Sequence, residues 1–292
     1  MLVQLATIPG RDDRPNEDFP AALPDCAVLL DGAGGPAEMP TGCEHGTDWY
    51  VRQLGTWLLA GMGGQPGTAL TELLARGISE VAARHAGTCD LGDPGTPSTT
   101  VVMARLGPDA VEYLVLGDST LLIDRDGREP AVITDQRIEE VAVAEQEAMK
   151  ALPTGTAEHF AARVRFVGRQ RELRNRPGGY WITSADPAAA AQAFTGTVPT
   201  GGLRTVTLLS DGATRFIEFS LGGWRDLLGV LNREGIAAVF GRIRDAEAGD
   251  PDGARWPRAK RQDDAAIVHF SRFGQSSQPT GGALRRGAPA AR

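Results

Sequence analysis

The sequence predicts an α+β fold, in which one chain of 292 residues supplies both antiparallel strands and amphipathic helices. Several short apolar runs end in turn residues, which is typical of strands. Longer segments carry apolar residues at helical spacing. Tight turns at 107–109 and 126–127 separate consecutive strand segments, as in β-hairpins. With 41% hydrophobic and 23% charged residues, the composition is that of a globular protein with a sizeable core.

The N-terminal third contains the clearest strand signal. Residues 2–8 predict a short strand, and the polar stretch 10–18 predicts a solvated loop. The run 27–30 is apolar without a break, which indicates a strand buried on both faces. Segments 49–58 and 68–85 follow, and the spacing of their apolar residues predicts two helices.

The remainder of the chain repeats both patterns. The segments 99–106, 110–116 and 121–124 predict an antiparallel meander, and two later strands are expected at 205–209 and 265–270. Helices are expected at 136–152, 157–174, 187–194, 223–233 and 235–247. Residues 272–292 contain almost no apolar residues and predict a disordered tail.

Composition and motif searches exclude several classes. A net charge of −7 argues against a general nucleic-acid binder. No apolar run is long enough to span a membrane, and the N-terminus lacks signal-peptide features, so a cytoplasmic location is expected. Cys26, Cys43 and Cys89 are widely spaced without a CxxC pair, which favours buried free thiols over structural zinc or disulfides.

An aspartate beside glycine recurs directly after three apolar strands. The motifs are Asp31-Gly32-Ala33-Gly34-Gly35, Gly117-Asp118-Ser119 and Ser210-Asp211-Gly212. Asp263-Asp264 instead precedes the last strand, and an antiparallel neighbour would bring it to the same rim as the other acids. Carboxylates with backbone carbonyls form the ligand set of Mg²⁺ or Mn²⁺, so this rim predicts a divalent metal site.

Together with Asn16-Glu17-Asp18, these motifs resemble the metal-dependent protein phosphatases of type 2C, the PPM-type serine/threonine phosphatases, in their bacterial form. The matches follow that family's order and extend from about Arg11 to Phe270. The resemblance implies a four-layer α/β/β/α sandwich of two antiparallel sheets flanked by helices. Residues 1–271 would then form the catalytic domain.

The resemblance also implies a ligand set. Asp31 corresponds to the carboxylate that bridges two divalent cations, and the carbonyl of Gly32 would bind one of them. The other implied ligands are Asp211 and Asp263 on the second cation, Glu17 and Asp18 directly or through water, and Asp118 at a third, weaker site.

Arg14 is the counterpart of the family's phosphate-binding arginine and, with Asp31, the expected catalytic residue. Its distance from Glu17 is one residue shorter than usual, so Arg11 is an alternative. Asp264 also departs from the family, because asparagine usually follows the metal-binding aspartate. His45, the histidine nearest a motif, is interpreted as a surface or capping residue.

The implied activity is phosphomonoester hydrolysis by in-line attack of a metal-bridging hydroxide, with two or three Mn²⁺ or Mg²⁺ ions as cofactors. Phosphoserine and phosphothreonine proteins are the expected substrates, with neither nucleic acid nor membrane as partner. A small phosphorylated metabolite is an alternative substrate, and a non-catalytic binding module is an alternative function. Residues 136–186 are expected to form a substrate-selecting flap, with Tyr180 and Trp181 as contact surface.

Overall fold

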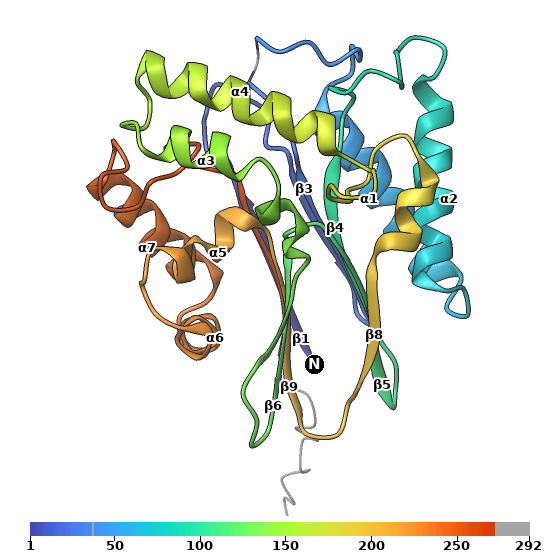
Figure 1. Cartoon of the computed structure of the whole chain (residues 1–292). Helices are drawn as coiled ribbons and strands as arrows, with labels where there is room; N and C mark the ends of the chain where they lie inside the picture. The colour runs from blue at the N-terminus through green and yellow to red at the C-terminus, as the bar shows by residue number, and fades with distance from the viewer. Residues whose placement is uncertain (37, 272–292) are drawn as a thin grey trace, which may run out of the picture.

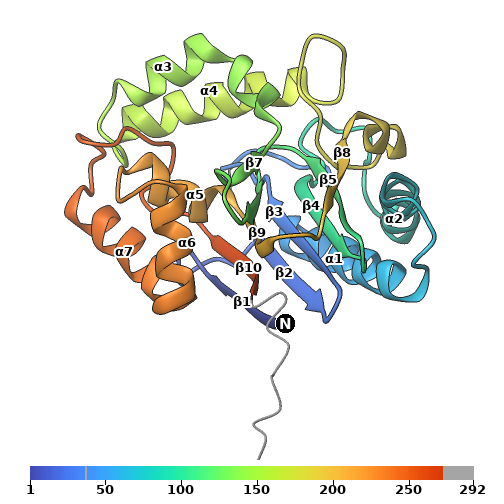
Figure 2. The same cartoon turned by 90° about the horizontal axis from the view of Figure 1, so that it is seen from below.

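Two five-stranded antiparallel sheets pack face to face in the computed structural model, which describes residues 1–36 and 38–271 (Figure 1). Sheet A has the strand order β1-β10-β9-β6-β7, and sheet B has the order β2-β3-β4-β5-β8. Helices α1 and α2 lie outside sheet B, and α5, α6 and α7 lie outside sheet A (Figure 2). The predicted four-layer sandwich is therefore confirmed. The predicted tail, 272–292, lies outside the described residues.

The strands of both sheets are short. They are β1 (Leu2–Ile8), β2 (Asp18–Leu23), β3 (Cys26–Gly32), β4 (Thr99–Leu106), β5 (Ala110–Leu116), β6 (Thr120–Arg125), β7 (Ala131–Ile133), β8 (Phe194–Pro199), β9 (Leu203–Leu209) and β10 (Ala265–Ser271). The helices are α1 (Thr47–Gly64), α2 (Leu70–His85), α3 (Val143–Lys150), α4 (Ala157–Leu173), α5 (Asp211–Glu218), α6 (Trp224–Arg233) and α7 (Ile236–Gly249). Short 3₁₀ turns lie at Gln136–Glu140 and Pro187–Gln192.

Strand β3 is buried on both faces, as its apolar run predicts. Ala27 and Leu29 join the cluster between the two sheets, whereas Val28 and Leu30 join the cluster under α1 and α2. Alternate residues of a strand point to opposite faces, so this one segment contributes to two cores. A third cluster packs α5, α6 and α7 against the outer face of sheet A.

Three expectations about the strands are corrected. The meander is broken, because β5 pairs with β4 in sheet B while β6 pairs with β9 in sheet A. Gly117, with φ of 86°, lies where the chain crosses between the sheets. Strand β2 was missed because Pro20 argues against a strand. The proline is tolerated because β2 lies at the edge of its sheet. Strand β8 was missed, because the sequence analysis assigned no element between the expected helix 187–194 and the expected strand 205–209.

The expectations about helices and thiols also need correction. The expected helix 136–152 divides into a 3₁₀ turn and α3, and Asp211 begins a helix, α5, that the sequence analysis did not assign. Of the three cysteines only Cys26 is buried. Cys43 and Cys89 are half-buried, and their sulfur atoms lie 3.3 Å apart.

His269 in β10 is expected to make folding stability depend on pH. Its ring is buried, its Nδ1 lies 2.8 Å from Thr207 Oγ1, and burial lowers its pKa to about 4. A lowered histidine pKa means that folding favours the neutral ring. The contribution of His269 to the free energy of unfolding is therefore complete above about pH 6.5 and is lost as the pH falls toward 4. The free energy of unfolding should fall by up to about 3 kcal/mol.

Urea unfolding of wild type and His269→Gln at pH 7 and pH 4.5 measures this contribution. The difference in unfolding free energy between the two proteins should shift in favour of the variant at the lower pH. An unchanged difference would show that folding does not lower the pKa of His269.

Candidate metal centre

Acidic side chains from both sheets meet at one edge of the sandwich. Asp18 begins β2 and Asp31 lies near the end of β3, and the two residues face each other across the strand pair. Asp211 follows β9 and Asp263 precedes β10, so the antiparallel pairing brings them together as predicted. The backbone N–H of Asp211 donates to Asp31 Oδ2 at 3.0 Å, which links the two sheets at this edge.

Burial among like charges perturbs these carboxyl groups. Burial, followed by the negative charges of Asp211, Asp18, Asp118 and Asp263, raises the pKa of Asp31 well above its ordinary value. Burial and neighbouring aspartates likewise raise the pKa of Asp18 and Asp211. The pKa of Asp118 is raised to about 7 by burial and by Asp211. Ionised carboxylates at this density need cations close by.

The chemistry of these donors fits a hard divalent cation. The donors are carboxylate oxygens, the ligands that Mg²⁺ and Mn²⁺ prefer. One buried oxygen, Asp18 Oδ2, has no hydrogen-bond partner among the residues that the structure describes. A buried acceptor without a partner is costly, and a bound cation would remove that cost.

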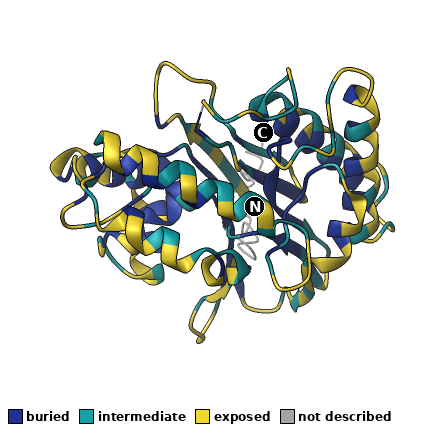
Figure 3. Cartoon of the chain, turned by 45° about the horizontal axis from the view of Figure 1, so that its top comes forward, coloured by how far each residue is buried: buried dark blue, intermediate teal, exposed yellow. Residues whose placement is uncertain are grey.

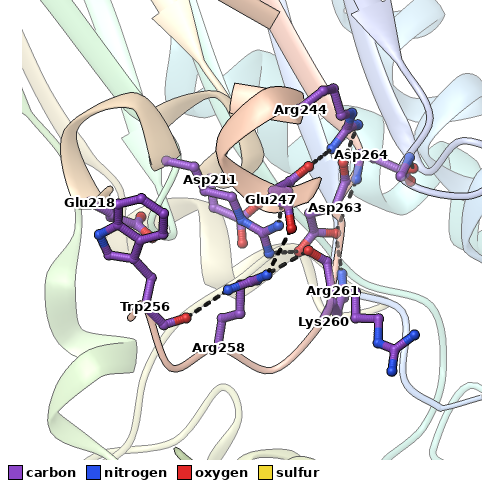
Figure 4. Close-up of polar contacts among 12 residues, drawn as sticks. Asp211, Glu218, Arg244, Glu247, Trp256, Arg258, Lys260, Arg261, Asp263 and Asp264 are labelled. Atoms are coloured by element: carbon purple, nitrogen blue, oxygen red, sulfur yellow. Dashed lines mark hydrogen bonds and ion pairs between the residues drawn. The ribbon is translucent and has the colours of Figure 1, made fainter. Parts of the chain in front are cut away.

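Asp263 differs from the other predicted ligands, because cationic side chains contact both of its oxygens (Figure 4). Lys260 Nζ lies 2.6 Å from Oδ1, and Arg215 Nη2 lies 3.2 Å from Oδ2. Burial alone would raise the pKa of Asp263, but Lys260 and Arg215 outweigh burial and lower it. Arg215 also pairs with Glu247, which in turn accepts from Arg244 at 2.6 Å.

Asp264 connects the start of β10 to the N-terminal loop. Its Oδ1 accepts from the N–H of Gly10 at 2.7 Å, and its Oδ2 accepts from the N–H of Glu17 at 2.8 Å. An asparagine could accept only one of these bonds, because its amide nitrogen is a donor. The carboxylate of Asp264, at a position where the resembled family usually has asparagine, therefore holds the backbone of Glu17 in place.

A family model described as protein phosphatase 2C matches residues 11–242. The chain belongs to the protein phosphatase 2C family. Asp31, Asp118 and Asp211 lie within the matched region, whereas Asp263 lies beyond it. No curated protein matches the sequence. The part of the chain that the structure describes has no helix of the length and apolar character needed to cross a membrane.

Solved structures of protein phosphatase 2C type share the fold at low sequence identity. The serine/threonine phosphatase Stp1 from Staphylococcus aureus is 14% identical, with a TM-score of 0.57 over 93% of this chain and 95% of that one. The catalytic domain of PstP in complex with two manganese ions is 16% identical, with a TM-score of 0.52 over 92% and 96%. PppA, a key regulatory component of T6SS in Pseudomonas aeruginosa, is 17% identical, with a TM-score of 0.53 over 93% and 99%.

Two arginines were predicted to bind phosphate in this protein phosphatase 2C domain. Arg11 is exposed, and its Nε donates to Asp13 Oδ1 at 2.8 Å. Arg14 is exposed, and both arginines border a cavity of about 750 Å³ that Glu17 and Asp263 also line. Arg14 forms no ion pair among the described residues, whereas Arg11 is paired with Asp13, so Arg14 is the better candidate for the predicted phosphate contact.

Glu17 lies beside the glycine turn after β3. A Cβ atom on Gly34 would overlap the carboxyl group of Glu17, so a larger residue there would have to displace that side chain. The pKa of Glu17 is raised to about 7 by burial, with Asp264 and Asp263 adding to the effect and Lys260 opposing it. The N–H of Gly32 donates to the carbonyl of Glu17 at 3.1 Å, which ties the turn to the loop before β2.

Two basic residues of the site were not predicted from the sequence. Lys260 and Arg163 line the cavity beside Arg14 and also a second one of about 750 Å³ that Asp31, Asp118 and Asp211 border. Arg163 comes from α4, whose arginine-rich sequence is typical of a solvated helix. Only the three-dimensional arrangement distinguishes these residues from ordinary surface charges.

Helices α3 and α4 lie above the sheet edge at which the acidic side chains meet. Figure 3 shows their mixture of exposed and half-buried residues. After α4, Arg174 Nη1 donates to Ser98 Oγ at 2.7 Å. Tyr180 is buried but borders the cavity that Asp118 and Asp211 line, and Trp181 is half-buried against the core under α1 and α2. The expectation that these two aromatics offer a contact surface stays a prediction.

Proposed function

We propose that this protein is a metal-dependent phosphoserine/phosphothreonine protein phosphatase. The observation that carries the proposal is the meeting of Asp18, Asp31, Asp118 and Asp211 at one sheet edge, with an oxygen of Asp18 left without a partner among the described residues. Family membership supports the same chemistry. The protein whose structure most directly supports the cofactor is PstP, whose catalytic domain is in complex with two manganese ions.

The proposed cofactors are two Mn²⁺ or Mg²⁺ ions, with a third as a weaker site. Asp31 is the proposed shared ligand, and the carbonyl of Gly32 would bind one of the two ions. Glu17, Asp18, Asp211 and Asp263 would complete the two principal sites, and Asp118 would serve the third. Such ions supply Lewis acidity, which activates water near neutral pH and stabilises negative charge on phosphoryl oxygens.

The protein's own residues would position the substrate. Arg14 is the proposed phosphate ligand, because a guanidinium donates two parallel hydrogen bonds to phosphoryl oxygens. Arg163 and Lys260 add positive charge between the two cavities. The cavity over Asp118 is also bordered by Lys150, Arg171 and Arg174, which favours an anionic substrate.

Hydrolysis of p-nitrophenyl phosphate with Mn²⁺, with Mg²⁺ and with chelator tests the proposal. Turnover is expected with at least one ion and should be lost when the chelator removes it. Absence of turnover with either ion would reject the enzyme proposal. Manganese uptake measured by calorimetry would then separate an inactive metal-binding module from a protein whose carboxylates bind no metal.

A separate comparison tests the substrate class. Phosphoserine and phosphothreonine peptides should be hydrolysed with a higher kcat/KM than sugar or nucleotide phosphates. A preference of about a hundredfold for a metabolite, equivalent to about 2.7 kcal/mol, would instead assign a small-molecule substrate.

A further inference from the structure

Four side chains with sulfur and nitrogen donors converge away from the carboxylates. They are Cys43 and His45, in the loop between β3 and α1, and His85 and Cys89, at and just after the end of α2. One donor atom from each residue lies within 4.8 Å of every other. His85 is buried, and the two cysteines are half-buried.

Four of the separations between these donors are close to those of a tetrahedral zinc site. Zn–S bonds of about 2.3 Å and Zn–N bonds of about 2.0–2.1 Å place tetrahedral ligands about 3.3–3.8 Å apart. Cys43 Sγ lies 3.6 Å from His85 Nδ1 and 3.8 Å from His45 Nδ1. Cys89 Sγ lies 3.2 Å from His45 Nδ1 and 3.3 Å from Cys43 Sγ.

Surrounding contacts favour a shared ion over a simple pair of thiols. A disulfide would need the two sulfur atoms at about 2.05 Å and would leave the convergence of both histidine Nδ1 atoms unexplained. The ring of Trp49 lies 4.4 Å from that of His45 and 5.0 Å from that of His85, measured between centroids. An aromatic wall of this kind shields a metal site from water.

We propose that Cys43, His45, His85 and Cys89 bind a structural zinc ion. The two metal centres would then differ in chemistry, because thiolate and imidazole donors suit zinc and carboxylate oxygens suit Mn²⁺ or Mg²⁺. The absence of a CxxC pair argued against structural zinc in the sequence, but the ligand pairs here have the spacing Cys-x-His and His-x₃-Cys.

The zinc would fasten the loop that leaves the metal-bearing strand β3. The same loop is already tied at two places, since Arg171 Nη1 donates to the carbonyl of Pro40 at 2.9 Å and the N–H of Asp90 donates to the carbonyl of Gly42 at 2.8 Å. The loop begins with the glycines beside Glu17. A zinc ion would therefore stabilise one wall of the candidate active site without contacting substrate.

The test is elemental analysis of the full chain, expressed with added zinc and freed of any affinity tag. Wild type should carry about one zinc per chain, and Cys43→Ser and Cys89→Ser should lose most of it. Cys26→Ser is the matched control and should keep its zinc, because Cys26 is buried in the core under α1 and α2. Zinc-free wild type, or equal zinc in all variants, would overturn the proposal.

Two further measurements keep the proposal testable if the serine variants fold poorly. Wild type reconstituted with Co²⁺ should show the visible absorption of a tetrahedral cobalt–thiolate centre. Intact-mass analysis without reductant should show free thiols. A mass lower by two hydrogens in protein lacking zinc would identify a Cys43–Cys89 disulfide and overturn the proposal.

The zinc proposal can fail independently of the proposed phosphatase activity. Asp31→Asn should keep its zinc while it loses manganese-dependent turnover. Cys89→Ser should lose zinc and still bind manganese, with a lower melting temperature. Zinc lost from Asp31→Asn but kept by Cys89→Ser would place the ion at the carboxylates instead.

Discussion

Replacement of Asp31 by asparagine is expected to lower kcat by several powers of ten and to raise the melting temperature of the metal-free protein. The loss of turnover follows from the proposed bridging role, because removal of a shared ligand dismantles a two-metal centre. The gain in stability follows from charge, since Asp31 is half-buried near the carboxylates of Asp18, Asp118 and Asp211. The neutral amide removes repulsion among them.

The sign of the pH effect follows from the raised pKa. A carboxyl group whose pKa is raised in the folded state makes the protein less stable as the pH rises from the ordinary pKa of the group through the raised pKa. The metal-free wild type should therefore be less stable at pH 8 than at pH 5.5, through Asp31 together with Asp118 and Glu17, whose pKa values are about 7. The variant should show a weaker dependence.

Steady-state kinetics with p-nitrophenyl phosphate and thermal melts in chelator measure both effects. Asp124→Asn is the matched control, because Asp124 is a buried aspartate on β6 that pairs with Arg204 at 3.5 Å and does not border either cavity of the site. It should keep full activity. An active Asp31→Asn protein would remove Asp31 from the proposed ligand set.

Replacement of Arg215 by methionine is expected to destabilise the protein by about 3–5 kcal/mol, the cost of leaving buried charges without their partner. Arg215 is buried on α5 and pairs with Glu247 and Asp263. Glu247 would keep its bond from Arg244, and Asp263 would keep its bond from Lys260. The two carboxylates would nevertheless lose their shared partner, and activity should fall as Asp263 moves.

Urea unfolding of a double-mutant cycle separates charge from packing. The second single variant is Glu247→Gln, and the double variant combines both changes. The double variant should be more stable than the sum of the single effects predicts, because it removes both Arg215 and Glu247 and leaves neither charge without the other. Arg242→Met is the control, since Arg242 forms an exposed pair with Glu234 at 2.9 Å and should change stability by less than about 1 kcal/mol. Additive effects would show that Arg215 and Glu247 do not stabilise the protein through their ion pair.

The sequence was most informative where local pattern and chemistry coincide. The unbroken apolar run before Asp31 predicted a strand buried on both faces, and the structure confirms it. The order of the acidic motifs, through the family resemblance, predicted the four-layer sandwich. Asp263 precedes its strand whereas Asp211 follows its own. Because antiparallel strands run in opposite directions, this order predicted that the two residues would meet.

What the sequence did not reveal depends on contacts between distant segments. Lys260 and Arg163 resemble ordinary surface charges until the fold places them between the two cavities. Trp181 packs partly against the core under α1 and α2, a contact that its local sequence does not reveal. Strand β6 crosses to the other sheet because of long-range pairing with β9, which no local turn signal encodes. The roles of the individual ligands remain predictions.

The position of β10 has a consequence for synthesis on the ribosome. β10 lies between β1 and β9 in sheet A and is the sole partner of β1 among the described strands, although about 250 residues separate them in sequence. The first strand to emerge must therefore wait with its edge unpaired until Ser271 has left the exit tunnel. Asp263 and the Asp264 contacts to Gly10 and Glu17 arrive in the same final segment. A nascent chain halted before residue 263 should expose the edge of β1 to chaperones or to aggregation. It should also have no activity, because it lacks Asp263 and β10.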